Sequence, residues 1–162
     1  MVSEFGLTYG LLRITARGTG EPLNPKFGII IGDPLWKAVK KLVPDASAYS
    51  VDYPASAAPC SRELGSQDVI NHLVAQSSKC PNQKYALVGY SQGAGVIHEA
   101  MKTIDASLYP KIVALVMFGD FGKEYPQLCI TESYSVQETK DQILKLLLDQ
   151  SLQIFHLHWH SD

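Results

Sequence analysis

The segment GYSQG at residues 89–93 constrains the fold of this chain more than any other feature. The apolar run before it, residues 85–88, predicts a strand, and the small residues from Ala94 onward predict a helix packed close to that strand. A G-x-S-x-G turn between strand and helix lifts its serine above the sheet, where a substrate can reach it. We therefore interpret Ser91 as a nucleophile. A glycine-rich turn in another kind of α/β protein is the alternative.

The rest of the chain alternates between strand and helix patterns. Continuous or alternating apolar residues predict strands at 11–16, 49–53, 85–88 and 112–118, and helical spacing predicts helices at 34–42 and 66–77 and after Ser91. This order is typical of a parallel sheet with right-handed crossovers, in which sites lie at the carboxyl ends of the strands. We expect three loops to meet there: 17–21, 89–93 and the one that begins at Gly119.

Composition favours one globular domain over residues 1–162, because 46% of its residues are hydrophobic and 19% are charged. A formal net charge of -2 gives no electrostatic reason to expect a nucleic-acid partner. No apolar run approaches the roughly 20 residues of a transmembrane helix. The first residues have neither a basic leader nor an apolar core, so we expect no signal peptide in this chain.

Three cysteines, Cys60, Cys80 and Cys129, match no metal-binding spacing. An odd number leaves at least one thiol free or paired between molecules. A bond between Cys60 and Cys80 would tie the start of a predicted helix to the loop beyond its end. Three reduced cysteines are the alternative, and the sequence does not decide between them.

Four motifs together resemble the cutinase family of serine esterases, which also includes acetylxylan esterases. They are ARGTGE at 16–21, DYPA at 52–55, the cysteine-proline pair at 80–81 leading to GYSQGA, and FGD at 118–120. The resemblance covers about residues 11–120. It implies a three-layer α/β-hydrolase-like fold with a central, mostly parallel sheet and no metal or cofactor. It also implies secretion and hydrolysis of cutin, polyester, short-chain acyl or acetyl esters through an acyl-serine. We expect a monomer.

The resemblance assigns roles to residues of this chain. Ser91 becomes the nucleophile, and the backbone N–H groups of Thr19 and Gln92 become the oxyanion hole, with the Thr19 hydroxyl as a further donor. General hydrolase geometry agrees, because the residue after an elbow serine points its N–H at the developing oxyanion and an earlier loop supplies the second donor. Arg17 and Glu21 are expected to form an ion pair that braces the Thr19 loop.

Three departures set this chain apart from the family. The family's partner for Cys80 lies just before the first strand, where this chain has Thr8, so that bond is absent. The family's Gly-Asp segment, which supplies the catalytic acid, has no counterpart in residues 129–136. The tail, residues 121–162, is divergent. A catalytically impaired or truncated esterase-like protein that lacks a complete triad is therefore the alternative function, and we expect weak activity.

The base and the acid stay open. His156, His158 and His160 follow the serine, as the hydrolase order of serine, acid and histidine requires. They could instead form a metal face, although a frayed tail is the simpler reading. His72 and His98 lie in predicted helices and are interpreted as surface or packing residues. The acids considered are Asp120, at the end of a strand, and three from the tail: Glu132, Asp141 and Asp149.

Overall fold

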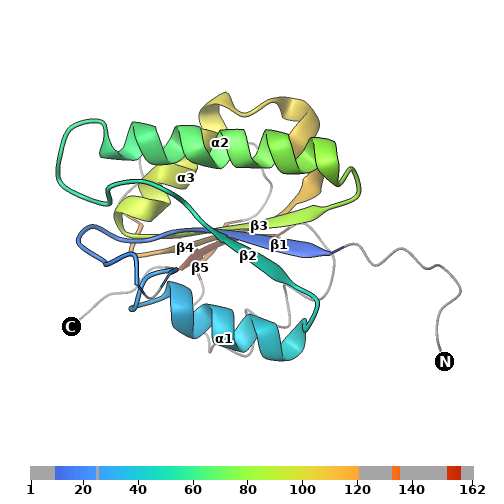
Figure 1. Cartoon of the computed structure of the whole chain (residues 1–162), viewed down its shortest axis with the longest axis horizontal. Helices are drawn as coiled ribbons and strands as arrows, with labels where there is room; N and C mark the ends of the chain where they lie inside the picture. Colours follow the sequence, from blue (N-terminus) through green and yellow to red (C-terminus); the bar gives the residue numbers. More distant parts are fainter. Residues whose placement is uncertain (1–9, 25, 121–132, 136–152, 158–162) are drawn as a thin grey trace, which may run out of the picture.

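The computed structural model describes residues 10–24, 26–120, 133–135 and 153–157. Its centre is a parallel sheet in the order β2-β1-β3-β4-β6-β5 (Figure 1). The strands are β1 (Leu11–Ala16), β2 (Ser47–Ser50), β3 (Lys84–Tyr90), β4 (Ile112–Phe118), β5 (Ser133–Ser135) and β6 (Gln153–Leu157). The predicted α/β fold with a central parallel sheet is confirmed, and two short segments of the divergent tail belong to that sheet.

Helices cover the two faces of the sheet unequally. Figure 1 shows α1 (Gly32–Leu42) on one face and α2 (Ser61–Lys79) with α3 (Gln92–Thr103) on the other, which makes three layers. A short 3-10 helix, η1 (Ala106–Lys111), leads into β4. Within the described ranges, no helix combines the length and the apolar character that a membrane span requires.

Strands β1 and β4 begin and end where the sequence predicts, whereas β2 ends three residues early. The N–H of Val51 still donates to the Thr15 carbonyl, at 2.9 Å. Beyond it, the Arg17 guanidinium donates to the carbonyls of Val51 and Tyr53, at 3.4 and 2.7 Å. A buried side chain thus takes over the carbonyls that a longer strand would have paired with its neighbour.

The main core lies between the sheet and the α2–α3 layer. Fully buried side chains from three strands meet there, among them Ile14, Leu87 and Leu115. Helix α2 begins five residues before the predicted start, and Gly65 lets these first turns pack closely against α3. A Cβ at Gly65 would lie 2.9 Å from a methyl carbon of Val96.

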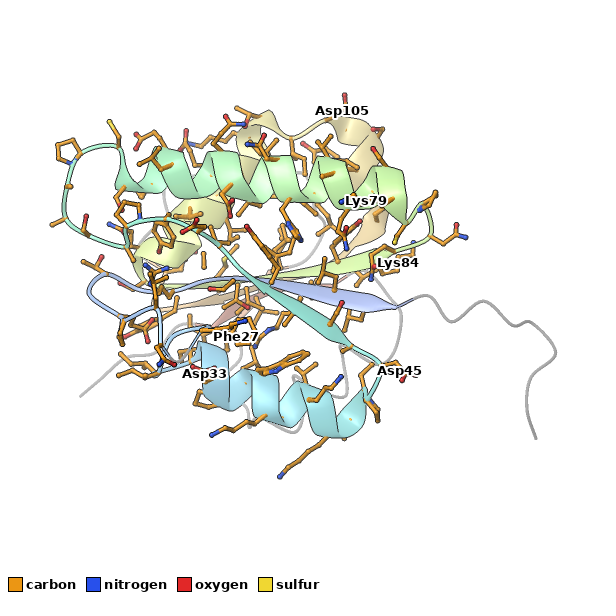
Figure 2. All side chains as sticks on the ribbon, viewed as in Figure 1. Phe27, Asp33, Asp45, Lys79, Lys84 and Asp105 are labelled. Atoms are coloured by element: carbon orange, nitrogen blue, oxygen red, sulfur yellow. The ribbon has the colours of Figure 1, made fainter. Side chains whose placement is uncertain are left out.

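The opposite face of β1 buries a cation. Arg13 is 1% exposed, lies against the rings of Phe27 and Trp36 at 4.6 and 5.1 Å, and donates to the Gly32 carbonyl at 2.8 Å. Phe27 lies near the start of α1, between that helix and the sheet (Figure 2). Burial lowers the pKa of Arg13 to about 9, an effect that nearby Asp33 opposes. Aromatic faces and a carbonyl stabilise the charge that burial disfavours.

Of the two alternatives for Cys60 and Cys80, the bond is excluded and free thiols are found. The two residues flank α2, whose 19 residues span about 28 Å, whereas a disulfide needs Cα atoms within about 7 Å. Both thiols are free and exposed. Cys129 lies outside the described residues.

A buried pair ties α3 to the end of β4. His98 Nε2 lies 2.8 Å from Asp120 Oδ2, and the two residues are 5% and 4% exposed. His98 is therefore a packing residue with a specific polar partner. The chain turns at Gly119, which has a φ of +55°, so that Asp120 points back into the protein.

We predict that His98→Ala lowers the free energy of unfolding by about 3 kcal/mol, because it leaves the buried Asp120 carboxylate without its histidine. Lys102→Ala is the matched control. It removes an ion pair of the same length, 2.8 Å, from the exposed side of the same helix, and should cost less than about 1 kcal/mol. Urea unfolding at pH 7 measures both changes, and equal losses would contradict the prediction.

Candidate active site

Ser91 lies at the turn between β3 and α3 with a strained backbone. Its φ of 51° and ψ of -116° fall outside the regions that non-glycine residues ordinarily adopt. Two hydrogen bonds hold this conformation. The Ser91 N–H donates to the Phe118 carbonyl at 2.9 Å, and its own carbonyl accepts from the Ala94 N–H at 3.0 Å. The turn has the backbone geometry that a nucleophile elbow requires.

Both glycines of the GYSQG segment allow close packing around this turn. A Cβ at Gly89 would lie 2.6 Å from the Cα of Ala94, so the strand and the helix could not approach each other. A Cβ at Gly93 would collide with the carbonyl oxygen of Ala16. The second contact presses the elbow directly against the end of β1, where the Thr19 loop begins.

The Thr19 loop, residues 17–21, is braced from inside, but the predicted Arg17–Glu21 ion pair is wrong. No ion pair between these two side chains is found in the described part of the chain. The Arg17 side chain donates to the carbonyls of Glu21, Val51 and Tyr53. The Glu21 carboxylate accepts from the Gly18 N–H at 2.6 Å and the Ile30 N–H at 2.9 Å. Each charge serves backbone groups, which stabilises the loop shape more directly than a mutual pair.

The aromatic ring of Tyr53 completes this bracing. It lies 5.0 Å from the Arg17 guanidinium, and its hydroxyl donates to the Arg17 carbonyl. Burial raises the pKa of Tyr53 well above its usual value. The hydroxyl therefore stays protonated and acts as a donor.

Thr19 and Gln92 lie on neighbouring loops at the carboxyl edge of the sheet. Thr19 is exposed in the turn after β1, and Gln92 is the first residue of α3. Because β1 and β3 are adjacent and parallel, and Gly93 packs on Ala16, the two loops share one side of the molecule. The structure therefore brings the two predicted donor residues to the same edge of the sheet as Ser91.

The side chain of Gln92 has partners that the sequence analysis missed. Its Nε2 donates to the Ser56 carbonyl at 2.7 Å, and its Oε1 accepts from the Ser61 hydroxyl at 3.2 Å. These residues lie 36 and 31 positions apart from Gln92, so no local pattern could have revealed them.

The structure brings Asp120 to the predicted edge, but His98 occupies its Oδ2 oxygen. Of the candidate bases, His156 lies in β6 at the register position of Met117, near the carboxyl end of the sheet. The other candidates, His158, His160, Glu132, Asp141 and Asp149, lie outside the described residues.

The remaining histidine, His72, is on α2 and away from the elbow. Its ring stacks on Tyr49 with centroids 3.5 Å apart, and burial lowers its pKa. Over the described ranges, no three histidine, cysteine or acidic residues gather closely enough to hold a metal ion.

Comparison with known proteins gives a consistent family. The model of the cutinase family matches residues 9–143. Cutinases from Trichoderma harzianum and Coprinopsis cinerea are each 36% identical to this chain over 65% of its length, and the matches cover 43% and 54% of those proteins. The chain thus spans about half the length of the curated relatives it matches.

Solved structures agree on the fold. A Trichoderma reesei cutinase in complex with a phosphonate inhibitor is 30% identical, with a TM-score of 0.56 over 68% of this chain and 51% of that one. A cutinase-like protein from Cryptococcus is 21% identical, with a TM-score of 0.59 over 68% and 53% of the two chains. With the α/β-hydrolase architecture, the elbow and the family match in agreement, this chain belongs to the cutinase family.

Proposed function

We propose that this chain is a carboxylic ester hydrolase of cutinase type, with Ser91 as its nucleophile. The strained backbone of Ser91 carries the proposal. Such a conformation costs free energy, and proteins keep it mainly at functional sites. The neighbouring Thr19 loop, shaped by the buried Arg17 and Glu21, supports it. Cutin-like polyesters and short acyl or acetyl esters are the proposed substrates, and secretion stays a prediction.

In the proposed reaction, Ser91 Oγ attacks the ester carbonyl carbon and passes its proton to a base. The carbonyl oxygen becomes an oxyanion, which accepts from the N–H groups of Thr19 and Gln92. The alcohol leaves with the proton, and water then releases the acid from the acyl-serine. We propose that one of His156, His158 and His160 is the base.

We predict that a fluorophosphonate probe labels this protein and that Ser91→Ala abolishes the labelling. The probe needs an activated hydroxyl, and Ser91 is the residue that the elbow presents. Intact-mass spectrometry measures one adduct per chain. An adduct on the Ser91→Ala variant would show that the nucleophile lies elsewhere.

We predict that Thr19→Val lowers kcat for a short-chain p-nitrophenyl ester by about 10²-fold, because the variant loses the hydroxyl donor but keeps the backbone N–H. Thr103→Val is the matched control. This variant removes a hydroxyl from an exposed residue in the last turn of α3. The hydroxyl donates to the Ala100 carbonyl of the same helix and not to the site, so kcat should stay unchanged. An unchanged kcat in Thr19→Val would show that the Thr19 hydroxyl is not a donor in the oxyanion hole.

We predict that alanine at one position among His156, His158 and His160 lowers turnover to the residual level of roughly 10³–10⁴-fold over water that binding and the oxyanion hole supply. The three single variants are compared with Ser91→Ala in the same p-nitrophenyl assay. If turnover is weak and none of the three variants lowers it, the chain is the catalytically impaired esterase.

A further inference from the structure

We infer that residues 53–61 form a strut that sets the spacing between the two halves of the oxyanion hole, and that Ser61 is the positioning residue through which the strut holds Gln92. The inference rests on the proposed function of the Thr19 and Gln92 N–H groups. It adds a role for the loop between β2 and α2, which the reaction itself does not use.

On the elbow side, Ser56, Ser61 and Gln92 form a closed ring of hydrogen bonds. The amide of Gln92 donates to the Ser56 carbonyl and accepts from the Ser61 hydroxyl, at 2.7 and 3.2 Å. The Ser61 hydroxyl in turn accepts from the Ser56 N–H at 3.2 Å. Ser61 is 2% exposed, so water does not replace it easily. Both ends of the Gln92 amide are engaged, and the residue whose N–H faces the oxyanion is fixed.

On the other side, the same segment holds the Thr19 loop. The N–H of Gly20, the residue after Thr19, donates to the Ala55 carbonyl at 2.8 Å. The carbonyl of Tyr53 accepts from Arg17, and the Tyr53 hydroxyl donates back to the Arg17 carbonyl. Two loops that lie about seventy residues apart in the sequence are therefore linked through one short segment.

The segment has features of a rigid element. Ala55 and Cys60 have φ values of 49° and 66°, in a region that non-glycine residues adopt only where surrounding contacts hold them. Its far end is Ser61, the first residue of the 19-residue helix α2, which packs against α3 at Gly65. A helix that is already fixed on α3 thus anchors the strut.

The energetic consequence falls on the transition state. Oxyanion-hole donors act at 2.7–3.1 Å from an oxygen whose charge develops only during the reaction. Loosening the strut would let the Gln92 N–H drift from that position, while the ground-state ester loses little. We therefore expect a loss of kcat with a nearly constant KM.

Ser61→Ala tests the strut, with Ser78→Ala as the matched control. Ser78 lies in the same helix, is exposed, and donates to the Val74 carbonyl of its own turn at 3.0 Å. Ser61→Ala should lower kcat for p-nitrophenyl butyrate, and the rate at which a p-nitrophenyl phosphonate inactivates the 162-residue chain, each by about tenfold, with KM within twofold. Ser78→Ala should change none of these values. Assays run well below the melting temperature of each variant, so that lost stability alone does not lower the rates.

Gln92→Glu provides a second route if Ser61→Ala does not fold. It keeps the backbone N–H but places a carboxylate oxygen against the Ser56 carbonyl, and should lower the same rates at least as much. Folded Ser61→Ala or Gln92→Glu with rates within twofold of the unchanged chain would overturn the strut alone. No reaction of Ser91 with the phosphonate in the unchanged chain would overturn the proposed function, and the strut with it.

Discussion

The hydrogen bond from the Ser91 N–H to the Phe118 carbonyl, at 2.9 Å, is the contact on which the arrangement of this site depends. It fastens a strained turn to the end of the neighbouring strand, so Ser91 keeps its unusual φ and ψ only while β3 and β4 stay paired. On its other side the turn packs against the carbonyl of Ala16, and this contact leaves room only for glycine at position 93. One turn is thereby locked between strands on both of its sides.

Around that turn, buried charges serve backbone groups and do not pair with each other. Arg17 donates to carbonyls of two different loops, and Glu21 accepts from N–H groups at positions 18 and 30. Loops at the edge of a sheet leave many such groups without ladder partners, and burying them unpaired is costly. A charged side chain that satisfies several at once gives a loop a single shape. This explains why an Arg–Glu pair four residues apart makes a poor ion pair here and an effective brace.

The sequence predicted those parts of the fold that depend on local patterns. The bounds of β1 and β4 follow from their apolar runs, and the GYSQG elbow follows from glycines whose role is steric and local. The end of β2 could not be predicted, because the distant Arg17 takes its carbonyls. The pairing of Ser61 with Gln92 and of His98 with Asp120 depends on how α2 and α3 pack, which no spacing along the chain encodes. The bond considered between Cys60 and Cys80 is absent for a related reason. Helix α2 extends at both ends beyond residues 66–77, whose apolar spacing predicted it, and so separates the two cysteines.

The pair between His98 and Asp120 marks a boundary in the sequence between the residues proposed to bind the oxyanion and those proposed to transfer the proton. Asp120 ends the strand next to the nucleophile strand, yet its Oδ2 contacts a histidine in the interior and both residues are almost fully buried. One oxygen of this carboxylate is thus engaged by His98 in the interior, whereas Ser91 lies at the carboxyl edge of the sheet. The proposed nucleophile and oxyanion donors are thus held by residues before Asp120, whereas the proposed base, one of His156, His158 and His160, follows it in the sequence. Strand β6 runs parallel to β4 with His156 opposite Met117, so the sheet itself carries the chain toward that edge.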